Sequence, residues 1–311
     1  ISSIFITFSP VIFAEISTLD DVKLFARLEK VDSWGLDSLF LNKGGSGLYY
    51  RPLIILSYHF DKIVWKLNPA LMHLENILLH AINSIILFFF LKYILSKIYK
   101  KNDRKDWIAF AGSIFFAVHP ITTESVNWIS GRTDILAATF VISSVYFIVI
   151  YLDCFEKKYL VLSGTMFLGG MFTKEVSVAL LPGIICLISC SDGYIFKKIK
   201  LRSKLSYLFG GVFFGIFLIL FFVLLRLIAY QKNSSAIGLT VKIILGDLYH
   251  SFFICMGTLG FYVKKMIWPF PLNIAIFEVD PLYEIFGVIV FLFCIYLLFK
   301  RTTAGAFFLV G

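Results

Sequence analysis

Residues 107–152 read WIAFAGSIFFAVHPITTESVNWISGRTDILAATFVISSVYFIVIYL and contain two apolar runs that flank a polar stretch. The first run covers 107–119 and the second covers 133–152. An ionisable side chain at the centre of a bilayer costs about 2.5–3.5 kcal/mol on insertion scales. Charges that gather at the ends of apolar runs therefore indicate a site, and this stretch predicts two membrane helices with a polar cluster at one end.

The composition of the whole chain agrees with that prediction. Hydrophobic residues make up 59% of the 311 residues and charged residues 16%, whereas soluble domains have about 45–50% apolar and about 25% charged residues. The apolar runs are near-continuous and about 15–27 residues long, while strands of a membrane barrel alternate over about ten residues. We therefore predict an all-α, polytopic transmembrane protein.

Apolar windows predict about nine or ten membrane spans. A truncated first span ends near Ala14, and a hydrophilic segment follows from Glu15 to Leu53. The stretch 53–67 (LIILSYHFDKIVWKL) carries Asp61 and Lys62 on one side, and it predicts an interfacial amphipathic helix in the first external loop, with both side chains facing water or another external loop. Further spans are expected at about 70–96, 107–119, 133–152, 159–173, 176–190, 205–230, 243–263 and 282–300, with another starting near 303.

The loops between the spans differ in charge, and this difference predicts which side of the membrane each occupies. Basic residues cluster in Lys92–Lys105, Lys157–Lys158 and Lys197–Lys204. Short loops rich in lysine and arginine stay in the cytoplasm. The intervening polar segments are therefore expected on the external or lumenal face. This pattern also accounts for the net charge of +9 better than nucleic-acid binding does.

The cysteines and the chain ends further limit the class of protein that the sequence can encode. The five cysteines lie in or beside apolar segments without paired spacing, so disulfide frameworks and zinc sites are not expected. The chain opens on Ile1 rather than Met and stops at Gly311 inside an apolar run, so we interpret residues 1–311 as a single transmembrane domain that is a fragment of something longer. His73 and His80, beside other polar residues of one span, are expected to form interhelical hydrogen bonds.

Several segments resemble a family of GT-C fold, the O-mannosyltransferases with transmembrane spans followed by TPR repeats, and its bacterial relatives. The segments are LDDVKLF (19–25), YYRPLIILSYHFD (49–61), LNPALMHLENILLHAIN (67–83), FFAVHPITTESVNWISGRTDIL (115–136) and FTKE (172–175), with a weaker match at VKKMIWPFPLN (263–273). They cover most of the first 180 residues in the order of the family. The TPR array is absent from this sequence, and the residues after 205 match in hydropathy alone.

The resemblance implies a site for polyprenyl-phosphate chemistry. A base must activate the acceptor, and cationic groups must hold the departing phosphate. Asp20 is expected to be the catalytic base, with Asp21 as its helper or substitute. Arg51, Arg132 and Lys174 are expected to bind the donor phosphate, because arginine forks match phosphate oxygens and lysine supplies a point charge. The remaining polar residues of the motifs are expected to form the scaffold of the site: His119, Glu124, Asp134 and Glu175.

Each assignment has a structural alternative. Asp20 and Asp21 also suit the first turn of an interfacial helix. Arg132 could pair with Asp134 or Glu124, and Lys174 with Glu175 or a neighbouring acid. No metal is assigned. A divalent metal at His119, Glu124 and Asp134 remains possible, although their spacing matches no recognised ligand pattern and favours a hydrogen-bonded scaffold.

The resemblance implies a glycosyltransferase that moves a mannose-like or other hexose from a polyprenyl-phosphate carrier to a protein or glycan acceptor. Its expected partners are this donor, the acceptor and membrane lipid, with no nucleic acid. It would act at the external or lumenal face of a bacterial cytoplasmic membrane, or of the ER membrane in a eukaryote. The rivals are a transporter or lipid flippase and a non-catalytic membrane scaffold. Transporters favour inverted repeats and polar groups near the midplane, and neither is evident here.

Overall fold

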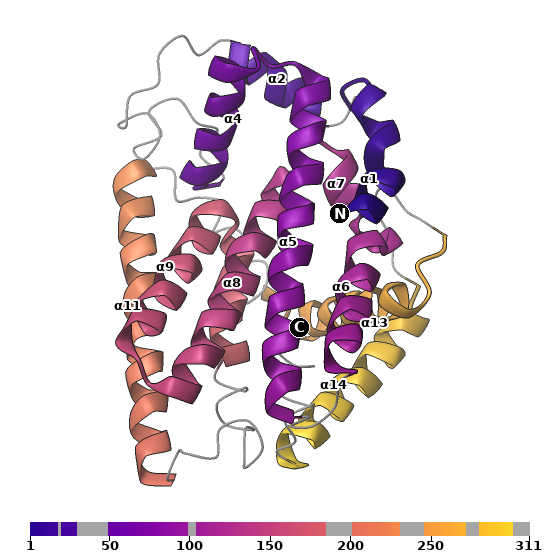
Figure 1. Cartoon of the computed structure of the whole chain (residues 1–311). Coiled ribbons are helices and arrows are strands. Elements are labelled where there is room, and N and C mark those ends of the chain that lie inside the picture. The colour runs from indigo at the N-terminus through magenta and orange to yellow at the C-terminus, as the bar shows by residue number, and fades with distance from the viewer. Residues whose placement is uncertain are drawn as a thin grey trace.

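The computed structural model describes residues 1–17, 20–29, 49–98, 104–184, 201–230, 246–271 and 280–300. Within these ranges every regular element is a helix, as predicted (Figure 1). The elements are α1 (Ser2–Phe8), η1 (Ser9–Phe13), α2 (Asp21–Glu29), α4 (Pro52–Val64), α5 (Pro69–Ile98), α6 (Lys105–Val118), η2 (Pro120–Thr122), α7 (Thr123–Asn127), α8 (Arg132–Cys154), α9 (Lys157–Thr173), η3 (Glu175–Ala179), α11 (Leu201–Tyr230), α13 (Leu248–Ile267) and α14 (Leu282–Lys300).

Three of the described helices are long and apolar enough to cross a membrane. They are Pro69–Lys97 of α5, Arg132–Cys154 of α8 and Gly210–Ala229 of α11. Shorter apolar helices cover Ser2–Phe13, Glu175–Ile184 and Leu282–Leu297. The chain is thus a helical membrane protein, and the full count of nine or ten spans remains a prediction.

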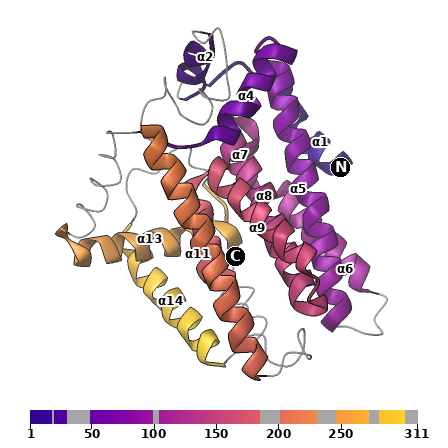
Figure 2. The ribbon, with the colours of Figure 1, turned by 90° about the vertical axis from the view of Figure 1, so that its left-hand side faces the viewer.

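The long helices define two ends of a bundle. α5 and α11 run along the molecule, and α8 and α9 form an antiparallel pair between them (Figures 1 and 2). α1, α2, α4 and α7 gather at the end where α5 and α8 begin, which we call the site end. The opposite, basic end holds the last turn of α5, the first turn of α6 and the α8–α9 turn, with their lysines. α5 and α6 are joined there by the ion pair of Lys92 with Asp106, 2.9 Å long.

The core is continuous along the α8–α9 pair. Val149 and Met171 are fully buried in it, and Leu218 of α11 and Phe90 of α5 pack against the same cluster. The α8–α9 turn closes at Phe155, whose φ of 58° is left-handed and ends α8. Burial of apolar residues on all four helices therefore fixes the central part of the bundle.

α4 confirms the helix expected at 53–67, and Lys62 turns to the α2 segment as expected, donating to the Leu28 carbonyl oxygen, but Asp61 departs from the prediction. Proline at its first position is compatible with the missing backbone donor there. Asp61, expected to face water or another external loop, is completely buried. The side chains that α4 does expose are apolar ones, Leu56, Phe60, Ile63 and Val64.

α13 and α14 pack through glycine. α13 lies crosswise to α5 and α11 in both views. A Cβ on Gly287 would lie 1.7 Å from the Met256 carbonyl oxygen, and one on Gly260 would lie 2.2 Å from the Tyr283 carbonyl oxygen. Only glycine allows the two backbones to approach so closely, as is common between membrane helices.

Other predictions fall outside the described residues. They are the middle of the hydrophilic segment (30–48), residues 185–190 of one expected span and 243–245 of another, the side chains of the basic loop Lys197–Lys204, and the span starting near 303.

Candidate functional site

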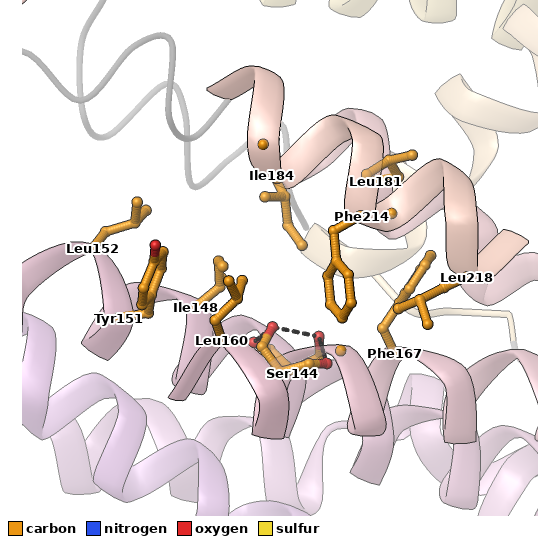
Figure 3. A pocket seen from close by; sticks show the side chains of 15 residues that line it. Ser144, Ile148, Tyr151, Leu152, Leu160, Phe167, Leu181, Ile184, Phe214 and Leu218 are labelled. Carbon is orange, nitrogen blue, oxygen red and sulfur yellow. Dashed lines mark hydrogen bonds between the residues drawn. The ribbon is translucent and has the colours of Figure 1, made fainter. Parts of the chain in front are cut away.

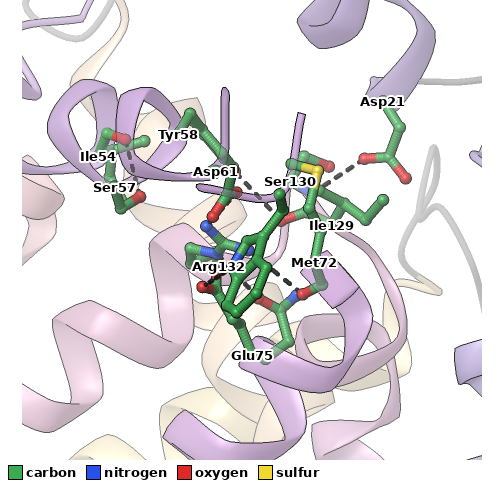
Figure 4. Close-up of polar contacts among 12 residues, drawn as sticks. Asp21, Ile54, Ser57, Tyr58, Asp61, Met72, Glu75, Ile129, Ser130 and Arg132 are labelled. Carbon is green, nitrogen blue, oxygen red and sulfur yellow. Dashed lines mark hydrogen bonds and ion pairs between the residues drawn. The ribbon is translucent and has the colours of Figure 1, made fainter. Parts of the chain in front are cut away.

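Arg132, in the first turn of α8, is the centre of a buried polar network (Figure 4). Its side chain is 1% exposed. Its guanidinium lies 2.5 Å from Asp61 Oδ2 and 2.9 Å from Glu75 Oε2. It also donates to Asn76 Oδ1 at 3.0 Å and to the Met72 carbonyl oxygen at 3.2 Å. Arg132 therefore joins α4, α5 and α8 at the site end.

Aromatic side chains enclose this network. The Tyr58 ring centroid lies 5.1 Å from Arg132 Cζ, and the Tyr58 hydroxyl donates to the Ile129 carbonyl oxygen at 3.1 Å. The Trp65 indole N–H donates to Glu75 at 2.6 Å. Burial raises the pKa of Tyr58, so its hydroxyl stays a neutral donor.

One guanidinium serves two carboxyl groups here, with consequences for their protonation. Burial, together with hydrogen bonding to Glu75, raises the pKa of Asp61 to about 7, against the opposing effect of Arg132. Two carboxyls that share one cation in a buried space do not both ionise easily. Asp61 therefore holds a proton more readily than an isolated carboxyl does.

Asp21 connects the first helix of the loop to the start of α8. It begins α2 and is completely buried. Its Oδ1 accepts the Ser130 backbone N–H at 2.9 Å, and its Oδ2 accepts the Ser17 backbone N–H at 3.1 Å (Figure 4). The neighbouring Asp20 is exposed. Both expected acids thus lie at the site end, one anchored in the protein and one open to its surface.

Arg51 and Glu175 form a second polar contact across the site end. Arg51 Nε donates to Glu175 Oε2 at 3.0 Å, and Arg51 NH2 lies 2.9 Å from the same oxygen. The Tyr50 backbone N–H donates to Glu175 Oε1 at 3.1 Å. The Arg51 guanidinium also lies over the Tyr49 ring, 4.2 Å from its centroid. Both members of the ion pair keep 23% of their side-chain surface exposed.

Lys174 forms a third contact beside the second, because it directly precedes Glu175 at the end of α9. It pairs with Asp134 of α8, and the Asp134 side chain is 47% exposed. Partial burial, and then the charge of Asp134, raise the pKa of Glu124, while Lys174 acts in the opposite direction. Two cations and three carboxyl groups therefore gather at a partly open surface.

His119 contacts the turn that follows it and the end of α13. Its Nδ1 accepts the Ile121 backbone N–H at 3.2 Å, and its Nε2 lies 3.1 Å from the Met266 carbonyl oxygen of α13. A neutral ring with the proton on Nε2 satisfies both bonds. Both ring nitrogens are thus occupied, and the role of His119 as site scaffold stays a prediction. Among the described residues there is no group of three or more His, Cys, Asp or Glu side chains placed to hold a metal ion.

Of the two α5 histidines that were expected to bond between helices, His80 does so within the described residues. His80 lies 2.9 Å from the Ala117 carbonyl oxygen, and Asn83 donates to that of Ile135 at 2.9 Å. His73 differs, because in the described part of the chain neither of its ring nitrogens has a hydrogen-bond partner.

Sequence reasoning missed the partners of Arg132. It offered Asp134 and Glu124, yet the structure supplies Asp61 and Glu75. The available signal was the position of these acids within otherwise apolar helical segments, where an unpaired charge is costly.

Comparison with known proteins finds relatives that are all named protein O-mannosyl-transferase TMTC. Protein O-mannosyl-transferase TMTC2 of Homo sapiens is 31% identical over 194 residues, which cover 60% of this chain and 21% of the relative. TMTC3 of Homo sapiens is 31% identical over 174 residues, 52% of this chain and 17% of the relative. TMTC1 of Mus musculus is 36% identical over 106 residues, 34% of this chain and 10% of the relative.

The matches define how far the similarity extends. This chain spans about a fifth or less of the length of these curated relatives. No family model matches it, and no solved structure does. Over the matched part, the chain is similar to the TMTC protein O-mannosyltransferases, the family that its sequence motifs resemble.

Proposed function

We propose that this chain carries the active site of a GT-C glycosyltransferase that moves a mannose-like sugar from a polyprenyl-phosphate carrier to a protein hydroxyl. The observation that carries the proposal is the partly open cluster of Arg51 and Lys174, at the same end of the bundle as Asp20. A phosphate needs cations, and the acceptor needs a nearby base. The names of the relatives support the reaction class.

Arg51 and Lys174 are the proposed phosphate ligands because their present partners are easily exchanged. Each is paired with a carboxylate at a surface that stays partly exposed. Ion pairs of that kind contribute about 0–1 kcal/mol. An incoming phosphate, with more negative charge and several acceptor oxygens, competes well with one carboxylate.

Arg132 differs from Arg51 and Lys174 because its side chain is buried and its partners are not easily exchanged. Its guanidinium contacts two carboxyl groups, an amide oxygen and a carbonyl oxygen, and its side chain is 1% exposed. Separating one partner from a buried pair costs about 3–5 kcal/mol. We propose that Arg132 positions α4, α5 and α8, and that contact with the donor phosphate would require Asp61 or Glu75 to release it.

Asp20 is the proposed base, and Asp21 the residue that holds it in place. The two oxygens of Asp21 already accept backbone N–H groups, whereas Asp20 is exposed to an acceptor. Proton removal from the acceptor hydroxyl by Asp20 accompanies attack on the sugar's anomeric carbon, while the bond to the carrier phosphate breaks. Arg51 and Lys174 then stabilise the negative charge that develops on the departing phosphate.

The test measures sugar transfer to a peptide and donor binding side by side, using polyprenyl-phosphate mannose in nanodiscs. Asp20→Asn should reduce transfer by roughly 10²–10⁴-fold with donor binding unchanged. Glu15→Gln, which neutralises another exposed acid in the same stretch, should leave both unchanged. Near-normal transfer by both Asp20→Asn and Asp21→Asn would favour the scaffold, and movement of a solute across the membrane would favour the transporter.

A second pair of variants tests the cations. Arg51→Gln and Lys174→Gln should weaken donor binding and transfer together, because each removes charge from the phosphate in ground and transition states alike. Lys23→Gln on α2, an exposed lysine, is the matched control. Unchanged donor binding in both site variants would reject the proposed phosphate subsite.

A further inference from the structure

A cavity of about 190 Å³ lies between α8, α9 and α11, away from the charged cluster (Figure 3). Its lining on α8 runs from Ser144 to Leu152. These residues follow Asp134 by 10 to 18 positions, so at 1.5 Å per residue the cavity lies about 15–27 Å along the helix from the site end. The cavity thus belongs to the half of the bundle nearer the basic end.

The walls of the cavity offer hydrocarbon and almost no free polar groups. Ser144 and Ser163 donate to each other's carbonyl oxygens, both at 2.9 Å, so their hydroxyls are satisfied (Figure 3). Most other lining side chains are aliphatic or aromatic, including Ile148, Phe167 and Phe214. A polar ligand would gain no hydrogen bond from the paired serines.

Glycines keep the cavity open on α11. Gly210 and Gly211 line it, and a Cβ built on either would meet no heavy atom within 4 Å. An apolar cavity of about 150 Å³ already stays dry and binds benzene. In a bilayer the abundant apolar molecules are lipid chains, which gain dispersion contacts by filling such a space.

Charge beside the cavity indicates the headgroup. On α9, Lys157 precedes Leu160 by three residues and Gly164 by seven, so all three share one helix face. Leu160 and Gly164 line the cavity, and Lys157 is exposed one turn beyond them at the basic end. Lys158, on another face, is paired with Glu156 at 2.5 Å.

We propose that the cavity binds an acyl chain of an anionic phospholipid whose net negative headgroup lies at Lys157. The lipid enters from the leaflet at the basic end, where lysines attract anionic headgroups. The polyprenyl-phosphate donor, in contrast, would place its phosphate at the site end, at the opposite end of the bundle from Lys157. The phospholipid site is therefore separate from the proposed transfer reaction and does not depend on it.

The test is photocrosslinking in nanodiscs with a phosphatidylserine that carries a diazirine in the middle of one acyl chain. Mass spectrometry should map the label to α8, α9 and α11. Gly211→Leu fills open space in the cavity and should reduce this labelling at least tenfold. Gly246→Leu is the matched control, because a Cβ there also meets nothing within 4 Å but lies outside the cavity.

Headgroup variants keep the test decisive if Gly211→Leu folds poorly. Lys157→Ala should lower phosphatidylserine labelling roughly fivefold, which corresponds to about 1 kcal/mol for one basic residue near an anionic surface. Lys158→Ala should change it little, and a matched phosphatidylcholine probe should respond to neither variant. Equal labelling of Gly211→Leu and Gly246→Leu, equal effects of the two lysine variants, or labelling only by a diazirine-bearing polyprenyl phosphate would each overturn the proposal.

Discussion

Replacement of Arg132 by methionine should destabilise the site end more than any other single loss of charge there. The substitution keeps an unbranched side chain but removes the cation shared by Asp61 and Glu75. Breaking a buried ion pair by removing one partner costs about 3–5 kcal/mol. Asn76 and the Met72 carbonyl also lose a donor. We therefore expect a loss toward the upper part of that range.

Arg51→Met supplies the comparison. It removes an arginine from an ion pair of similar length, 2.9 Å, but with 23% exposure on both sides, and should cost about 1 kcal/mol or less. Reversible unfolding in mixed detergent, followed by circular dichroism, gives both free energies. The double variant Arg132→Met with Asp61→Asn should cost less than the sum of the single changes, because the uncompensated charge is gone. Equal losses for Arg132→Met and Arg51→Met would refute the reasoning.

Other measurements follow from the same structure. The free energy of unfolding should fall as pH rises from about 4 to about 7. The pKa of Asp61 is 3.8 in the unfolded chain and about 7 in the folded one, so the folded state binds the extra proton in that window. Asp61→Asn should flatten this slope in unfolding titrations, and an unchanged slope would show that another group causes it. Asp21→Asn should destabilise by about 1–3 kcal/mol, since a backbone N–H loses its charged acceptor, while Asp20→Asn should leave the unfolding free energy unchanged. Gly287→Ala should separate α13 from α14 and lower the thermal midpoint, whereas Gly211→Ala should not, and equal midpoints would contradict the close packing.

Hydropathy predicted most of the fold because lipid leaves the backbone few choices. A segment that enters a bilayer must satisfy its own hydrogen bonds, so an apolar run such as 133–152 becomes a helix. The boundaries of α8, Arg132–Cys154, lie within two residues of that prediction. The helix of α4 was predicted at 53–67 from its amphipathic pattern, and it begins within one residue of that prediction but ends three residues earlier, at Val64.

The pattern of α4 predicted an interfacial helix with an apolar side, which is exposed, but it did not predict that Asp61 would be buried. A soluble amphipathic helix buries its apolar side, but lipid reverses the advantage of doing so. Asp61 turns inward because Arg132 offers it a partner, and that partner lies 71 residues further along the chain. Pairings over such separations depend on tertiary packing, so local periodicity carries no information about them.

For the site residues, too, the sequence predicted the general location but not the individual contacts. The charge of the loops predicted which polar segments gather at one end, but the specific contacts of Asp21 and Glu175 depend on backbone groups. Asp21 binds the backbone of Ser130, and Glu175 binds that of Tyr50. Every residue except proline carries a backbone N–H, so no side-chain pattern reveals which one is used.

The contact of Glu175 with Tyr50 has a consequence for biosynthesis. The two residues are separated by 125 positions, and Asp21 is separated from Ser130 by 109. The segment that holds Asp20 and Arg51 precedes α8 and α9 in the chain, so during translation it is made before the helices that carry its partners. A nascent chain that has not yet reached Glu175 therefore lacks the contact of Glu175 with Tyr50, because nonlocal contacts form only when both partners are present. Assembly of the charged cluster is thereby timed to the insertion of the helices that support it.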